Sequence, residues 1–187
     1  MTMKRRAFTL AALSCATPSL WAIQSNSVYQ LKAQLTDQSG LMHDLDFLRG
    51  QPVLVAMFYT NCQTMCPMII DAIRANEAAL SSAEQARMRV LMISFDDQRD
   101  TVAALKATAT ERNLTSPHWT LARSDPKTVR RIAAALGVQY RRTDDGDYNH
   151  SSIISLLDPE GRIAARTFRM TGPDPKLTQT AHALLSE

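Results

Sequence analysis

The chain has 187 residues, of which 45% are hydrophobic, 21% are charged and 6% are aromatic. This length gives room for one domain with a hydrophobic core, and the composition excludes collagen-like, disordered and disulfide-scaffold proteins. The formal net charge of +3 comes from residues 1–22, which hold three of the 21 basic residues and no acidic residue. The rest of the chain carries 18 charges of each sign, so we expect no nucleic-acid partner.

The N-terminal segment has the pattern of an export signal. Lys4-Arg5-Arg6 precedes an apolar run at 7–13, and small residues lead to an expected cleavage point after Ala22. The apolar run is too short and too interrupted for a membrane span. We therefore predict a cleavable signal at 1–22, a single domain at 23–187, and a mature protein that is periplasmic or faces the periplasm.

Two details leave the type of signal open. Arg5-Arg6-Ala7-Phe8 resembles a twin-arginine signal, which delivers folded proteins. Ala12-Leu13-Ser14-Cys15 is similar to a lipoprotein signal, and a lipid on Cys15 would tether the protein to a membrane. The simpler interpretation is that Cys15 is removed with the signal.

The first elements of the mature chain are predicted to be strands. Residues 28–35 alternate between apolar and polar side chains, 37–40 have the composition of a turn, and 41–45 can return as a hairpin partner. Residues 52–59 form a continuous apolar run, which is typical of a strand buried on both faces.

The remaining chain alternates helices and strands. We expect helices at 66–80, about 100–112, 126–136 and 175–185, and strands at 88–95, 119–122, 153–157 and 163–168. Ser124 or Asp125 is expected to cap the third helix, and Gly137 to end it. Residues 158–161 have the composition of a hairpin turn. This order predicts an α/β protein with a mixed sheet between helices.

Two cysteines remain after the signal, Cys62 and Cys66, and both lie where the first buried strand runs into a helix. A disulfide between residues four apart closes too short a loop to stabilise the fold much, so the pair fits a chemical role better. A helix N-terminus favours a thiolate, which suits Cys66 as a nucleophile or metal ligand. Two such thiolates can form a disulfide or bind a soft ion such as cuprous copper.

Among the four histidines, His150 is the best placed to add a third ligand. It follows the polar stretch 143–147 and precedes a predicted strand, at a loop end from which its side chain can turn toward the cysteines. His43, His118 and His182 have the sequence surroundings of ordinary surface or core histidines.

Three motifs, in this order, resemble the Sco/SenC family. They are Cys62-x-x-x-Cys66-Pro67 after an apolar strand, the run Ser94–Thr101, and His150-Ser151 followed by Asp158–Gly161. The resemblance extends over residues 28–185. It implies an α/β protein with a thioredoxin-like fold, in which a central mixed sheet is flanked by helices and a β-hairpin is added at the N-terminus.

The same resemblance implies a site for one copper ion, cuprous or cupric, with Cys62, Cys66 and His150 as ligands. Asp96 and Asp100 would support these ligands from behind. The implied function is delivery of copper to a respiratory copper enzyme such as cytochrome c oxidase, or maintenance of that enzyme's thiols. The expected partners are therefore an apo copper enzyme, with a cytochrome c oxidase subunit as the leading candidate, and a thiol reductant of the thioredoxin type.

The chain departs from the family's pattern around these ligands. Gln63, Thr64 and Met65 stand where a proline and an acidic residue are common, and Asn149 replaces an acid before the histidine. Met65 is a candidate thioether ligand, although core filling better explains most methionines of this chain. The expected ligands are retained while their surroundings differ, so the client enzyme and the redox potential stay open.

The alternative function is a periplasmic thiol–disulfide oxidoreductase that uses Cys62 and Cys66 without a required metal. Thioredoxin-type enzymes usually have two residues between their cysteines, so the three found here favour the copper chaperone. His150 discriminates between the two functions, because dithiol exchange does not require it. A peroxidase ranks third, since the characteristic peroxiredoxin motif around Cys62 is missing.

Overall fold

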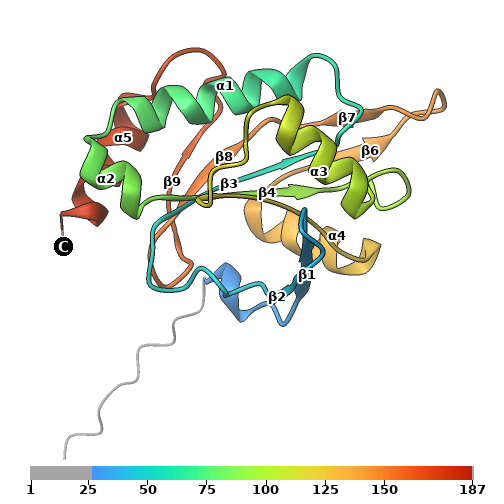
Figure 1. Cartoon of the computed structure of the whole chain (residues 1–187), viewed down its shortest axis with the longest axis horizontal. Helices are drawn as coiled ribbons and strands as arrows, with labels where there is room; N and C mark the ends of the chain where they lie inside the picture. Colours follow the sequence, from blue (N-terminus) through green and yellow to red (C-terminus); the bar gives the residue numbers. More distant parts are fainter. Residues whose placement is uncertain (1–26, 187) are drawn as a thin grey trace, which may run out of the picture.

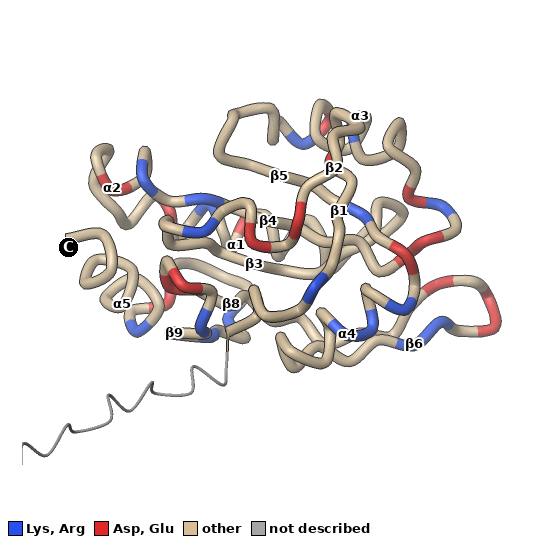
Figure 2. The backbone as a smooth tube through the Cα atoms, turned by 90° about the horizontal axis from the view of Figure 1, so that it is seen from below, with Lys and Arg blue, Asp and Glu red and all other residues tan. Residues whose placement is uncertain are grey.

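The structure is a computed structural model that describes residues 27–186. The expected export signal, its cleavage point after Ala22 and Cys15 lie outside the described residues. Within these residues, no helix has the length and apolar character needed to cross a membrane. Figure 2 shows Lys and Arg interspersed with Asp and Glu along the described chain.

A mixed seven-stranded sheet with the order β2-β1-β5-β4-β3-β8-β9 forms the centre of the fold. Its strands are β1 (Gln34–Asp37), β2 (Met42–Asp44), β3 (Val53–Phe58), β4 (Arg89–Ser94), β5 (Trp119–Arg123), β8 (Ile154–Leu157) and β9 (Ile163–Thr167). The three central strands β3, β4 and β5 run parallel, and the pairs on either side of them are antiparallel. The predicted mixed sheet is thus confirmed.

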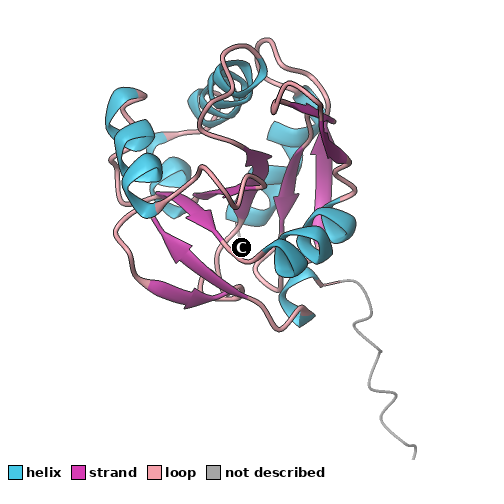
Figure 3. Ribbon diagram, turned by 90° about the vertical axis from the view of Figure 1, so that its right-hand side faces the viewer, coloured by secondary structure: helices cyan, strands magenta, loops and turns pink. Residues whose placement is uncertain are grey.

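Helices cover both faces of this sheet (Figures 1 and 3). They are α1 (Met65–Ala78), α2 (Ser82–Arg87), α3 (Val102–Glu111), α4 (Pro126–Leu136) and α5 (Pro175–Leu185), with the short 3-10 helix η1 (Val28–Gln30). Figure 1 shows α1 and α3 above the sheet and α4 below it. The predicted bounds of α4 and α5 are correct, and Asp125 and Gly137 cap α4 as expected.

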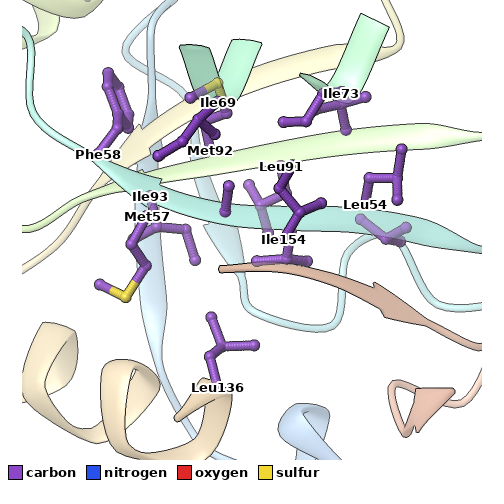
Figure 4. Close-up of a cluster of buried hydrophobic side chains, with 14 of the residues drawn as sticks. Leu54, Met57, Phe58, Ile69, Ile73, Leu91, Met92, Ile93, Leu136 and Ile154 are labelled. Carbon is purple, nitrogen blue, oxygen red and sulfur yellow. The ribbon is translucent and has the colours of Figure 1, made fainter. Parts of the chain in front are cut away.

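The hydrophobic core lies between the sheet and these helices. Every residue of β3 is buried, because β4 and β8 flank it and helices cover its two faces. Phe58, Ile69 and Met92 gather near the end of β3 that leads to the cysteines (Figure 4). The elements that carry Cys62 and Cys66 are therefore fixed by the best packed part of the molecule.

The predicted strand at 28–35 is wrong in its first half. Residues 28–30 form η1, and the strand is confined to β1. Val28 and Tyr29 are both buried, an arrangement that an alternating half-exposed strand cannot provide, and the Tyr29 ring lies directly against Gly161. The N-terminal β-hairpin itself is confirmed, since β1 and β2 pair around a turn in which Asp37 accepts two backbone N–H groups.

Two features were not predicted. One is α2, which a Ser81–Glu84 capping box begins. The other is a separate two-stranded hairpin, β6 (Tyr140–Arg142) and β7 (Tyr148–His150), inserted between α4 and β8. Figure 1 shows this hairpin reaching out beside the N-terminal end of α1. The polar stretch 143–147, expected as a loop, is the turn of this hairpin.

Candidate metal centre

The cysteine loop, residues 59–64, leads from β3 into α1 and places both thiols at the helix N-terminus. Thr64 occupies the N-cap position but its side chain caps nothing. Instead, the Cys62 sulfur accepts a hydrogen bond from the Cys66 N–H at 3.2 Å. Both cysteines are buried and free in the structure. A sulfur atom therefore caps this helix, and the positive end of the helix dipole stabilises negative charge on it.

His150 reaches this loop from the far end of the chain. It is the last residue of β7, and its ring lies against Tyr59 at 6.0 Å and Phe95 at 5.1 Å between ring centroids. One ligand atom from each of Cys62, Cys66 and His150 lies within 4.8 Å of the other two. The structure thus brings together the three residues that the sequence motifs single out, from two segments 84 residues apart.

The two thiols have opposite electrostatic environments. Hydrogen bonds from the Cys66 side chain, from His150 and from the N–H groups of Cys66 and Thr64 hold the pKa of Cys62 well below its ordinary value, although burial acts against them. Hydrogen bonding to Cys62, together with burial, raises the pKa of Cys66 far above its ordinary value. Without metal, this environment favours the thiolate at Cys62 and the protonated thiol at Cys66.

Asp100 ties the cysteine loop to the end of β4. Its buried carboxylate accepts from the Thr60 N–H at 3.0 Å, from the Thr60 hydroxyl at 2.5 Å and from the Ser94 hydroxyl at 2.5 Å. Burial raises the pKa of Asp100, against these hydrogen bonds. Asp100 therefore braces the loop from behind and does not belong to the group of three ligand atoms.

Asp96 has a parallel role on the other side. Its buried carboxylate pairs with the Arg99 guanidinium and also accepts the Arg99 N–H at 3.2 Å. The guanidinium carbon of Arg99 lies 5.8 Å from the Tyr59 ring centroid and 5.6 Å from that of Tyr148. Asp96 is thus connected to the site through Arg99 and these rings, and its N–H donates to the Ser94 hydroxyl at 3.0 Å.

The three other histidines are each paired with a carboxylate elsewhere in the fold. His43 contacts Asp37 at 2.8 Å, His118 contacts Glu77 at 3.2 Å, and His182 contacts Glu84 at 2.6 Å. Within residues 27–186, Cys62, Cys66 and His150 are the only group of three metal-ligating side chains found. The expectation that the other histidines have ordinary roles agrees with these contacts.

A pocket of about 370 Å³ gives access to the site. Its lining residues are Tyr59, Asn61, Cys62, Gln63, Thr64, Met65, Asp147, Tyr148, Asn149 and His150. Met65, the first residue of α1, therefore lines the pocket. Tyr59 and Asp147 belong to the site although the sequence motifs did not indicate them. The aromatic residues on either side of the acidic turn, Tyr140 and Tyr148, are the signal that could have revealed the hairpin.

Comparison with known proteins agrees with this geometry. The SCO1/SenC family profile matches residues 23–186. The chain belongs to the SCO1/SenC family. The SCO2-like protein RP587 of Rickettsia prowazekii is 26% identical over 162 residues, which cover 80% of this chain and 77% of that protein.

Two solved Sco structures share the fold. The copper-bound ScoI of Bradyrhizobium japonicum is 28% identical to this chain and superposes on it with a TM-score of 0.65. The match covers 81% of this chain and 94% of the ScoI chain. BsSco, described as a member of the Sco family of cytochrome c oxidase assembly proteins, is 20% identical, with a TM-score of 0.68 and coverages of 82% and 91%. The predicted family and the thioredoxin-like fold are thereby confirmed.

Proposed function

We propose that this protein is an exported copper chaperone that holds one copper ion with Cys62, Cys66 and His150 and passes it to a respiratory copper enzyme. The observation that carries the proposal is the convergence of two sulfur atoms and one imidazole within 4.8 Å, beside an open pocket that Cys62 and His150 line. Membership of the SCO1/SenC family and the copper-bound B. japonicum relative support it.

The chemistry of these ligands suits a carrier. Two thiolates are soft donors that favour cuprous copper, and imidazole binds both oxidation states. Cys66 is held in α1 and Cys62 by its hydrogen bond with the Cys66 N–H, while Cys62 and His150 line a pocket that the thiolates of a partner can enter. Copper can then leave by ligand exchange without passing through solvent. We expect the client to be an apo copper enzyme, with a cytochrome c oxidase subunit as the first candidate.

Copper titration of the reduced mature protein against a chromophoric cuprous chelator tests this proposal. We expect one copper ion per chain, and at least about a hundredfold weaker binding in Cys62→Ala and Cys66→Ala because a two-ligand remnant holds copper poorly. His150→Ala should bind more weakly than the parent, whereas His118→Ala, a histidine outside the site, should match it. Parent protein that fails to compete with the chelator, or His150→Ala that binds as tightly as the parent, would contradict the proposal.

A second function, thiol–disulfide exchange, is favoured by the unequal pKa values of the two thiols. The Cys62 thiolate would attack a client disulfide, forming a mixed disulfide and releasing one client thiolate. Cys66 would then lose its proton and attack Cys62 of the mixed disulfide, which releases the second client thiolate and leaves a Cys62–Cys66 disulfide. A thioredoxin-type reductant would restore the dithiol.

The same variants separate the two functions. Reduction of a model disulfide needs both cysteines, whereas His150 supplies only one of the hydrogen bonds that lower the Cys62 pKa. His150→Ala should therefore keep much of this activity while losing copper affinity. If the parent reduces no disulfide faster than free dithiothreitol at equal thiol concentration, the exchange function is wrong and copper carriage stands alone.

A further inference from the structure

The β6–β7 hairpin is joined to the rest of the fold mainly by side chains. Within the described chain its strands pair only with each other, and the turn bonds of 143–147 are internal. At its base, the Ser151 N–H donates to the Gln139 carbonyl at 2.9 Å, and the Gln139 N–H donates to the Ser151 hydroxyl at 2.9 Å. The position of His150 at the end of β7 therefore depends on what holds the hairpin against its neighbours.

Most of these side-chain contacts lead to the segment after β4, not to the cysteines. Tyr140 stacks on Phe95 with ring centroids 5.0 Å apart and planes 17° apart. Arg142 donates to the Gln98 side-chain oxygen at 2.7 Å. These contacts hold the hairpin near the site, but they do not fix its distance from the cysteine loop.

Apart from the hydrogen bond between the candidate ligands His150 and Cys62, one polar contact crosses directly from the hairpin to the cysteine loop. The Tyr59 hydroxyl donates a hydrogen bond to the Asp147 carboxylate. Tyr59 is only 3% exposed, and a buried hydroxyl requires a partner. Tyr59 lies three residues before Cys62, and Asp147 lies three residues before His150. The bond thus connects the two segments that supply the ligand atoms, at the same distance in sequence from a ligand on each side.

We propose that the Tyr59–Asp147 hydrogen bond is a latch that positions His150 over the two cysteines. It keeps the imidazole at ligand distance before copper arrives, so that binding does not have to order the hairpin. Tyr59 and Asp147 are positioning residues in this scheme and need not touch the ion. The consequence for copper rests on the proposed function, whereas the effect on the hairpin does not.

Amide hydrogen exchange of the reduced, copper-free protein tests the latch directly. We expect the amides of residues 140–150 to exchange about tenfold faster in Asp147→Ala and Tyr59→Phe than in the parent, because hydrogen bonds to charged groups are among the stronger ones. Asp147→Asn keeps an acceptor oxygen without the charge, so its amide exchange rates should fall between those of the parent and of Asp147→Ala. Asp144→Ala, which removes an exposed carboxylate from the same turn, is the matched control and should change nothing.

The variants also separate the bond from simple charge removal. If Asp147→Asn exchanges as fast as Asp147→Ala, the carboxylate charge and not the hydrogen bond holds the hairpin, and the latch is overturned. Unchanged exchange in Asp147→Ala overturns it as well. The double variant Tyr59→Phe/Asp147→Ala should exchange its hairpin amides no faster than either single variant, because both substitutions remove the same bond.

Copper affinity gives the second readout. We expect Asp147→Ala to bind cupric copper about tenfold more weakly than the parent, a usual cost of losing a residue that orients a ligand. Cuprous copper should be affected less, since the two thiolates dominate its binding. Faster exchange with unchanged cupric affinity would overturn the positioning role. His150→Ala serves as the reference: if it too leaves copper binding intact, the proposed function has failed, while the exchange result still decides whether the latch exists.

Discussion

The two cysteines and His150 are held by very different parts of the molecule. Cys62 lies in the loop between a fully buried strand and a long helix, Cys66 lies in the first turn of that helix, and the buried carboxylate of Asp100 braces the loop. His150 ends a three-residue strand of a hairpin that is half-exposed and attached through side chains. We call β3, the cysteine loop and α1 (residues 53–78), which hold the two sulfur atoms, the rigid base. We call the β6–β7 hairpin (residues 140–150), which holds the His150 imidazole, the arm.

The largest effect on the base should come from its core. Ile73 is fully buried in α1, so Ile73→Ala is expected to lower the free energy of unfolding by about 2–5 kcal/mol. Urea denaturation of the reduced protein measures this change. Asp71→Ala, at an exposed site of the same helix, should stay within about 0.5 kcal/mol of the parent. An equal loss in both variants would show that α1 is not the rigid base described.

The next effect concerns the brace behind the cysteine loop. Asp100→Ala leaves the Thr60 N–H and two hydroxyls without their acceptor in a buried place, so we expect a loss of about 3 kcal/mol. The loosened loop should also let a thiol reagent reach Cys62 faster in the folded protein. Asp100→Asn keeps one acceptor oxygen, so its stability and its thiol reactivity should lie between those of the parent and of Asp100→Ala. If Asp100→Ala matches the parent in both stability and thiol reactivity, Asp100 does not brace the loop.

A pH effect should arise in the base, far from the cysteines. Burial raises the pKa of Glu77, near the end of α1, to about 7, although Arg74 opposes the shift. The folded state therefore binds this proton more tightly than the unfolded chain, and the resulting stability is lost as pH rises through about 7. Glu77→Gln should unfold like the parent at pH 5 and be more stable at pH 8 by at most about 3 kcal/mol.

Thermal unfolding of both proteins between pH 5 and pH 8 measures this difference. The neighbouring His118, whose pKa burial lowers, lies 3.2 Å from Glu77 and should be replaced in a control, His118→Gln. A constant difference between parent and Glu77→Gln across this range would rule out Glu77 as the source.

The smallest stability effect is expected in the arm. Tyr140→Ala removes an aromatic contact with Phe95 worth about 0.5–1.5 kcal/mol beyond the area it buries, and because Tyr140 is only half-buried the total cost should stay below that of Ile73→Ala. Cupric affinity should nevertheless fall more in Tyr140→Ala than in Ile73→Ala at a temperature where both are folded. The opposite order would break the comparison, because it would make the core and not the hairpin the determinant of His150 placement.

The rigid base was largely predictable from the sequence, and the arm was not. The apolar run at 52–59 and the Pro126–Leu136 helix with its Asp125 cap each carry a local signal that tertiary packing reinforces. The strands of the hairpin are three residues long and mostly polar, Tyr-Arg-Arg in β6 and Tyr-Asn-His in β7, so they carry no alternating apolar pattern. Their structure depends on rings packed against Phe95, a contact between residues that are distant in sequence.

The candidate site divides in the same way. Cys62, Cys66 and His150 could be named from motifs, because their residue types and order are distinctive. Tyr59 and Asp147 could not, because an ordinary strand-end tyrosine and one aspartate among several become neighbours only when the hairpin folds back. Asp96 and Asp100 were expected as one supporting pair, yet one acts through Arg99 and the other through Thr60.

The narrow base of the hairpin has a consequence for how such a site can change over time. Gln139 and Ser151 are hydrogen-bonded to each other, so the chain leaves and re-enters the domain at nearly the same point. An insertion with adjacent ends can be lengthened, shortened or exchanged without altering the register of the sheet. The hairpin that carries His150 can therefore be exchanged as a unit. Replacing residues 140–150 alone offers a way to change the metal preference of the site, while Cys62, Cys66 and the elements that hold them stay unchanged.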